Sequence, residues 1–149
     1  ADRPRTRFDE LSPLNLNGVC FWSCNIAVDK KVFKGLGGFD EGFPYAALED
    51  TDFYERLKAV TSTTFLASAK VIHPWRRSGK WGNYKKWLKC HQYAVKKANT
   101  VKDFRFRIKR INLFLGLFFK QGKELVKYKF KGLNFYFELM YYHFLLIFY

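Results

Sequence analysis

A double glycine followed by a cluster of acidic residues constrains the fold of this chain more than any other feature. Gly37-Gly38 interrupts the chain, and the pattern beyond it predicts a helix that begins near Leu48. Six carboxylates follow the glycines, and we call them the acidic cluster: Asp40, Glu41, Glu49, Asp50, Asp52 and Glu55. Because like charges repel at close range, the fold has to place metal ions, cationic side chains or a polyhydroxylated ligand beside them.

Charged and aromatic residues are distributed very unevenly along the 149 residues. Residues 1–74 contain nine Lys or Arg and ten Asp or Glu, whereas residues 75–149 contain eighteen and three. Twenty of the thirty aromatic residues also lie in residues 75–149. This change predicts two parts, divided at His73-Pro74-Trp75. The basic, aromatic part suits an anionic partner such as a membrane surface, a phosphate-bearing lipid or nucleic acid.

The hydrophobic pattern of residues 1–74 predicts an α/β arrangement. Apolar runs at residues 19–28, 63–67 and 70–72 are interpreted as strands, the first of them buried. Residues 29–36 are expected to form one or two helical turns, with Asp29 as the N-cap. A longer helix is expected over residues 48–60.

Side chains on that longer helix suggest how it packs. Phe53, Leu57 and Val60 follow one another at helical spacing, so they are expected to face the core. Asp52 and Arg56 are four residues apart and are expected to form an ion pair.

Residues 75–149 are expected to be mainly helical. Residues 84–101 and 104–119 have the pattern of basic amphipathic helices, and residues 133–149 are almost wholly apolar or aromatic. None of these segments offers eighteen clean apolar residues, so a membrane-spanning helix is not expected. Helices that lie in the membrane interface fit this composition better.

The three cysteines give no framework of disulfides. The number of cysteines is odd, and no two of Cys20, Cys24 and Cys90 form a Cys-x-x-Cys pair. We expect buried, unpaired thiols in a reducing compartment.

Four landmarks occur in a fixed order: CNIAV, GGFDE, EDTDFYERL and VIH. Together they resemble the second half of the family 2 glycosyltransferases, which have the GT-A fold, and the C-terminal segment of the β-galactosyltransferases. The resemblance covers roughly Asn17 to His73. It implies that residues 1–74 are the acceptor-side half of a GT-A domain and that residues 75–149 are a basic helical tail.

The resemblance assigns four acids of the acidic cluster to the acceptor. Asp50 would be the catalytic base that deprotonates the acceptor hydroxyl, and Glu49, Asp40 and Glu41 would bind the acceptor. The first turn of a helix favours an ionised carboxylate, which agrees with a base at Asp50. The alternative is that the acids at residues 49–52 only stabilise the start of their helix.

Three further residues would serve the donor. The resemblance makes His73 a candidate ligand of Mn²⁺ or Mg²⁺, and Arg76 and Arg77 candidate phosphate-binding residues. An ordinary histidine at a strand end and a solvated basic loop are the alternatives.

The implied reaction is an inverting transfer of a sugar from a nucleotide-sugar donor to a saccharide or lipid-linked acceptor, assisted by Mn²⁺ or Mg²⁺. The donor-binding half of the family is absent from these residues, so donor binding would need an upstream region or a partner chain. We expect a location on the cytoplasmic face of a membrane. The alternative is a non-catalytic basic module that binds a membrane surface or, less in keeping with the motifs, nucleic acid.

Overall fold

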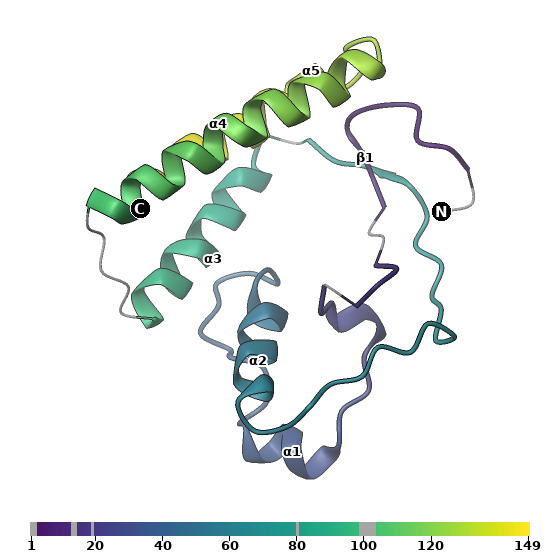
Figure 1. Cartoon of the computed structure of the whole chain (residues 1–149), viewed down its shortest axis with the longest axis vertical. Coiled ribbons are helices and arrows are strands. Elements are labelled where there is room, and N and C mark those ends of the chain that lie inside the picture. Colours follow the sequence, from purple (N-terminus) through teal and green to yellow (C-terminus); the bar gives the residue numbers. More distant parts are fainter. Residues whose placement is uncertain (1–2, 13–14, 19, 80, 99–103) are drawn as a thin grey trace.

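The structure is a computed structural model that describes residues 3–12, 15–18, 20–79, 81–98 and 104–149. Regular structure begins with a short strand and a 3₁₀ turn, β1 (Glu10–Leu11) and η1 (Ser23–Asn25). The elements that follow are α1 (Lys30–Gly35), α2 (Glu49–Lys58), β2 (Arg76–Arg77), α3 (Asn83–Lys97), α4 (Phe104–Lys127) and α5 (Leu133–Leu145). In Figure 1, α3, α4 and α5 lie together at one end, and α1 and α2 lie at the other.

The expected α/β fold, and with it the GT-A half, is wrong. Within the described residues the sheet consists of β1 and β2 alone, which pair antiparallel with Glu10 opposite Arg77 and Leu11 opposite Arg76. A GT-A half would need a much larger sheet. The second part of the chain is built mainly from the helices α3, α4 and α5, whereas the described residues of the first part are mostly loop around η1, α1 and α2.

The three predicted strands do not form in the described residues. The physical reason is that none of them has a neighbouring strand there to pair with. A strand leaves its backbone N–H and C=O groups unsatisfied unless another strand accepts them. The described part of residues 19–28 contains η1 instead of a strand, and residues 61–72 are exposed throughout. Cys20 and Cys24 are exposed as well, so the expectation of a buried thiol holds for Cys90 alone.

The helices around the acidic cluster form where the local signals predict them. Asp29 caps α1, because its Oδ1 accepts the backbone N–H groups of Lys31 at 2.8 Å and Val32 at 3.0 Å. Phe53 and Leu57 of α2 are buried, as expected. Val60 is exposed because α2 ends at Lys58, before the last position of the predicted stripe.

The predicted helices of residues 75–149 also form, with different ends. α3 ends at Lys97, and residues 99–101 of its predicted range lie outside the described residues. α4 continues eight residues beyond Phe119, to Lys127. Among the described helices, none is long and apolar enough to cross a lipid bilayer.

The main core joins the N-terminal segment to the last two helices. Its buried members are Phe8, Leu125, Phe135, Tyr136 and Met140. The Phe8 ring lies 5.8 Å from that of Phe135 and 5.9 Å from that of Tyr136. The backbone N–H of Phe8 donates to the Lys131 carbonyl at 2.8 Å, in the turn between α4 and α5. The N-terminal segment is therefore part of the helical end of the molecule.

Gly132 makes this close approach possible. It adopts φ +100°, and a Cβ there would lie 2.6 Å from the backbone nitrogen of Asp9. Both the backbone angle and the contact exclude a side chain at this position.

A buried carboxylate connects α5 to the start of α3. Glu138 is fully buried, and its Oε1 accepts the backbone N–H groups of Asn83 at 3.0 Å and Tyr84 at 3.2 Å. The first N–H groups of a helix lack partners within the helix, and the positive end of its dipole attracts a negative charge. Glu138 thus fixes the position of α3 on α5.

Removal of this cap should destabilise the helical end of the molecule. Glu138→Ala is expected to lower the free energy of unfolding by about 2–4 kcal/mol, because two N–H groups lose their acceptor. Glu138→Gln keeps an acceptor oxygen and should cost less. Urea unfolding followed by circular dichroism measures both, with Glu124→Ala on α4 as the control. Equal stability of Glu138→Ala and the control would contradict the cap.

Two histidines and an arginine meet where α3, α4 and α5 pack together. Arg110 Nη2 lies 2.6 Å from His91 Nε2. Burial lowers the pKa of His91 to about 4, and the Arg110 charge adds to the effect. Burial and Arg110 also lower the pKa of His143. Both rings are therefore neutral in the folded protein near neutral pH.

This arrangement predicts that acid weakens the fold before its carboxylates titrate. An unfolded histidine takes up a proton near its ordinary pKa of 6.5, whereas folded His91 does so only near 4. The unfolded state thus binds more protons between these values, and stability should fall as the pH is lowered from about 7 to about 5. The midpoint of urea unfolding at each pH measures this. His91→Gln should reduce the dependence and His73→Gln should not; an unchanged dependence in His91→Gln would contradict the assignment.

Candidate functional site

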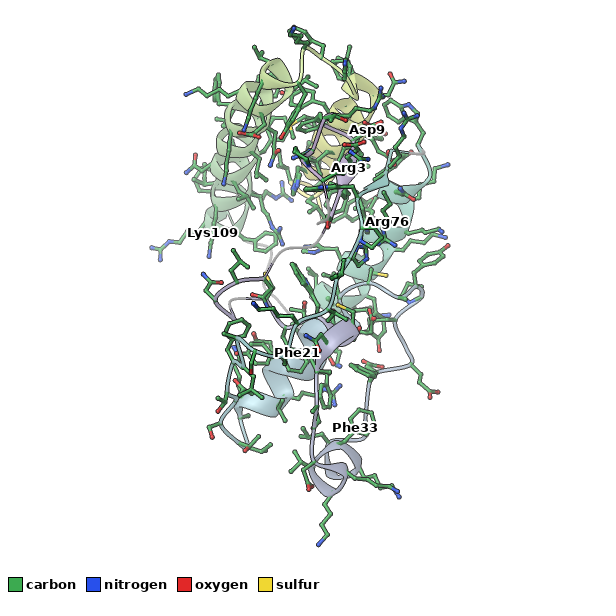
Figure 2. All side chains as sticks on the ribbon, turned by 90° about the vertical axis from the view of Figure 1, so that its right-hand side faces the viewer. Arg3, Asp9, Phe21, Phe33, Arg76 and Lys109 are labelled. Carbon is green, nitrogen blue, oxygen red and sulfur yellow. The ribbon has the colours of Figure 1, made fainter. Side chains whose placement is uncertain are left out.

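The acidic cluster rests on a small aromatic core of its own. Phe53 of α2 is fully buried, and the rings of Phe39, Phe33 and Phe21 lie 5.1, 5.3 and 6.3 Å from it. These contacts hold α2 against α1 and against the turn that follows α1. Figure 2 shows Phe21 and Phe33 at this end of the molecule.

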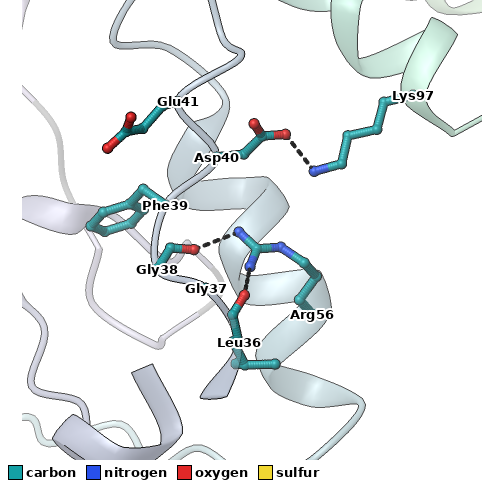
Figure 3. Close-up of a pocket in the computed structure, with 8 residues that line it drawn as sticks. All are labelled: Leu36, Gly37, Gly38, Phe39, Asp40, Glu41, Arg56 and Lys97. Atoms are coloured by element: carbon teal, nitrogen blue, oxygen red, sulfur yellow. Dashed lines mark hydrogen bonds and ion pairs between the residues drawn. The ribbon is translucent and has the colours of Figure 1, made fainter. Parts of the chain in front are cut away.

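The glycine turn is shaped by its two glycines and clamped by an arginine. Gly38 is buried at φ +69°, and a Cβ there would lie 3.1 Å from the Phe33 ring. Arg56 donates from Nη1 to the Leu36 carbonyl at 2.7 Å and from Nη2 to the Gly38 carbonyl at 2.8 Å (Figure 3). The planar guanidinium satisfies two backbone acceptors that the turn leaves free.

The predicted ion pair between Asp52 and Arg56 is confirmed. Arg56 Nε donates to Asp52 Oδ2 at 2.9 Å, across one turn of α2. Arg56 therefore joins the glycine turn to the acidic helix through all three of its nitrogen positions.

A lysine from α3 neutralises two acids of the cluster at once. Lys97 Nζ lies 2.7 Å from Asp40 Oδ2 and 2.6 Å from Asp52 Oδ1. Tyr93, one turn earlier on α3, donates its hydroxyl to Asp40 at 3.0 Å. The basic second part of the chain thus supplies the cations that the acidic first part requires.

These contacts change the acidity of the groups that take part in them. The hydrogen bond from Lys97 lowers the pKa of Asp40 to about 2, and the Gly42 N–H contributes to the shift. Burial alone would lower the pKa of the Lys97 ammonium, but its hydrogen bonds to Asp40 and Asp52 outweigh burial and raise it. The hydrogen bond to Asp40 raises the pKa of Tyr93. All these groups keep their ordinary charge states near neutral pH.

A pocket of about 350 Å³ opens over the glycine turn. Its walls are Leu36, Gly37, Gly38, Phe39, Asp40, Glu41, Arg56 and Lys97 (Figure 3). They combine carboxylates, two cations, backbone groups and one aromatic ring. Such a lining can bind the hydroxyl groups of a saccharide and contact an apolar face of its ring.

Asp40 and Glu41, two of the predicted acceptor residues, lie in this pocket, whereas Glu49 and Asp50 do not line it. Residues two apart on a helix point to nearly opposite sides, so Asp50 faces away from the Asp52 side. Asp50 Oδ2 lies 3.4 Å from the Ser23 backbone nitrogen, and Oδ1 accepts the Thr51 N–H at 2.8 Å.

Glu49 and Asp50 differ from Asp40 and Asp52 in charge compensation. Within the described part of the chain, no Lys, Arg or His forms an ion pair with either of them. Glu49 Oε2 is buried and has no hydrogen-bond partner among those residues. The first turn of α2 therefore presents two carboxylates that side-chain cations leave uncompensated.

The structure does not bring the predicted donor-side residues to the pocket. Arg76 and Arg77 form β2 and are exposed. Figure 2 shows Arg76 beside Arg3 and Asp9, far from Phe33 and the glycine turn. His73 lies just before β2, with Nδ1 3.2 Å from the Pro74 carbonyl oxygen and its own carbonyl accepting the Ser12 hydroxyl.

The residues present do not assemble a metal site. Where the structure describes the chain, no three His, Cys, Asp or Glu side chains come together as ligands. His73 offers one imidazole and belongs to no such group among the described residues. His73 alone does not fit a site for Mn²⁺ or Mg²⁺, which prefer several oxygen ligands.

Lys97 and Tyr93 are the site residues that sequence reasoning missed. They lie 57 and 53 positions from Asp40. Lys97 is one of many lysines on the basic helix, and no local pattern distinguishes it from Lys96. The excess of acids around α2 does predict that some cation has to approach it.

Comparison with known proteins adds no relative: no family model matches the chain, nor does any curated protein or solved structure with which it was compared.

The role of Lys97 can be tested against its neighbour. Lys97→Met is expected to lower the free energy of unfolding by about 1 kcal/mol, since Asp40 and Asp52 lose a shared but partly exposed cation. Lys96→Met, which removes an exposed lysine from the same turn of α3, should have little effect. Thermal and urea unfolding measure both variants. Equal losses, or no loss from either, would contradict the bridge.

Proposed function

We propose that the chain takes part in glycosyl transfer and that Asp50 is its catalytic base. The proposal is supported by the order of the four sequence landmarks around the acidic cluster, and it does not depend on the GT-A fold. The observation that carries it is the difference in charge compensation between the acids. Asp40 and Asp52 are bound by Lys97 and Arg56, whereas Asp50 lies in the first turn of α2, where the helix dipole favours a negative charge, and has no such cation among the described residues.

An acid without a cation partner is the kind of group that can accept a proton. In the proposed reaction, the acceptor hydroxyl transfers its proton to Asp50 while its oxygen forms a bond to the anomeric carbon of the donor. The bond between that carbon and the nucleoside diphosphate breaks in the same step, which inverts the configuration. The Ser23 backbone N–H, 3.4 Å from Asp50 Oδ2, lies beside the carboxylate that would take up this proton.

Glu49, Asp40 and Glu41 would bind the saccharide acceptor in this proposal. Glu41 is exposed at the pocket edge, and Asp40 is held in place by Tyr93 and Lys97. A carboxylate already fixed by protein contacts can accept a sugar hydroxyl at little further cost in side-chain entropy.

The donor side remains an expectation of the sequence resemblance. A nucleotide sugar would be bound by an upstream region or a partner chain, with Arg76 and Arg77 as candidate phosphate ligands. Mn²⁺ or Mg²⁺ is expected by the same resemblance, but His73 alone does not fit a metal site and we derive no step through the ion. The expected location is the cytoplasmic face of a membrane, with the protein bound peripherally.

A second candidate function is saccharide binding without catalysis. It is favoured by the position of the pocket, which lies on the Asp52 side of α2 and does not include Asp50. In that case the pocket residues would matter for binding, and Asp50 would only stabilise the start of α2.

The two candidates differ in the effect of Asp50→Asn. In the full-length gene product, this variant should release nucleoside diphosphate from the active nucleotide sugar at least about 100-fold more slowly, because the amide cannot accept the proton. Glu55→Gln, an exposed change on the same helix, should keep full activity. Removal of divalent ions with a chelator, followed by return of Mn²⁺ or Mg²⁺, tests the metal requirement. Equal activity of Asp50→Asn and Glu55→Gln would remove Asp50 as the base.

A further inference from the structure

α4 has apolar residues on two sides, and only one of them is covered. Phe114, Leu117 and Leu125 face the main core. On another side the exposed apolar residues form what we call the α4 stripe, in which they recur every three or four positions as far as Phe118: Phe104, Ile108, Ile111, Leu115, Phe118, Phe119 and Val126. An amphipathic helix of a globular protein normally exposes its polar side, so this second apolar side requires an explanation.

The stripe is long and well exposed. Phe104 is 78% exposed, Phe119 63% and Val126 58%. From Phe104 to Val126 it extends over about 33 Å, at 1.5 Å per residue. Figure 1 shows α4 along the outer edge of the molecule, with α5 on its far side.

Basic side chains border the stripe near both of its ends. On helical geometry Arg105 and Lys123 lie along one edge and Arg107 along the other, whereas Lys109 and Lys127 lie farther round the helix beyond Arg105 and Lys123. Figure 2 shows Lys109 pointing outward. Glu124, the one acidic residue of α4, lies on the side away from the stripe. The exposed side of α4 is thus apolar at its centre and cationic at its borders.

The apolar surface continues from α4 onto α5. The Phe118 ring lies 6.3 Å from that of Phe114, which in turn lies 6.2 Å from the Phe144 ring of α5. Phe114 and Phe144 belong to an open apolar pocket of about 580 Å³, whose remaining walls are Trp81, Phe137, Met140 and Tyr141. Aromatic residues of this kind are common where a protein meets the boundary between lipid headgroups and acyl chains.

We propose that the α4 stripe is the surface by which the protein binds an anionic lipid bilayer, an inference that rests on the proposed peripheral location. The apolar residues enter the boundary of the acyl chains, and the bordering Lys and Arg side chains meet the anionic headgroups. Charge decides between a bilayer and a second copy of the chain. Two stripes in contact would bring their basic borders together, whereas anionic lipids neutralise them.

Two leucines of α4 provide a matched test. Leu115 is 47% exposed within the stripe, and Leu113 is 49% exposed on the opposite side of the same helix. Flotation with phosphatidylcholine vesicles that contain phosphatidylserine measures binding of the whole chain. Leu115→Gln should weaken binding roughly fivefold to tenfold, since an apolar side chain no longer enters the bilayer, whereas Leu113→Gln should leave it unchanged.

The electrostatic part is tested in the same assay. Lys123→Gln should weaken binding roughly fivefold, and Lys30→Gln, on α1, should not. Vesicles of phosphatidylcholine alone should bind weakly. Equal binding to both kinds of vesicle, or equal effects of Leu115→Gln and Leu113→Gln, would overturn the proposal.

Analytical ultracentrifugation tests whether a second copy of the chain, in place of a bilayer, binds the stripe. A concentration-dependent dimer that Leu115→Gln dissociates would show that the stripe joins two copies, and would also overturn the proposal. Flotation uses no sugar and no nucleotide, so its failure leaves the proposed transfer reaction untouched. In the same way, loss of the Asp50 effect would leave membrane binding intact.

Discussion

The bridge from Lys97 to Asp40 and Asp52 is the interaction on which the two ends of this molecule depend. The acidic cluster brings carboxylates together around α2, and their repulsion has to be offset from outside the first part of the chain. Lys97 lies 2.7 Å from Asp40 and 2.6 Å from Asp52, and Tyr93 adds a hydrogen bond to Asp40. The uneven charge distribution therefore has a structural consequence, because α3 lies where Lys97 can pair with Asp40 and Asp52.

This charge compensation does not extend to every acid of the cluster. Arg56 and Lys97 compensate the acids that hold the glycine turn and α2 together. Glu49 and Asp50 receive no such compensation in the part of the chain that the structure describes. Acids that are paired with cations and acids that are not therefore lie next to one another on a single helix.

The N-terminal segment and α5 determine where α3 lies. Phe8 is buried among Leu125, Phe135 and Tyr136, and β1 pairs with β2 immediately before α3. Glu138 then fixes the start of α3 to α5. The position of Lys97 at the far end of α3 follows from both contacts, so the packing of the helical end also determines the geometry of the acidic cluster.

The features that the sequence predicts correctly are local ones. The Asp29 cap, the start of α2 and the pair of Asp52 with Arg56 depend on residues within four positions of one another. The predicted strands at residues 19–28, 63–67 and 70–72 are wrong because a strand depends on a distant partner, which apolar runs do not reveal. Lys97 could not be found for the same reason, since its partner Asp40 lies 57 positions away.

We propose that the pocket over the glycine turn binds a saccharide. The most direct test is a titration of the ¹⁵N-labelled protein with hexoses, N-acetylhexosamines and uronic acids, monitored by amide chemical shifts. The account predicts saturable shifts at Gly37, Gly38 and Phe39 with at least one of these sugars, and none at Gly116 on α4. An unchanged glycine turn with every sugar, while the protein remains folded, would contradict it.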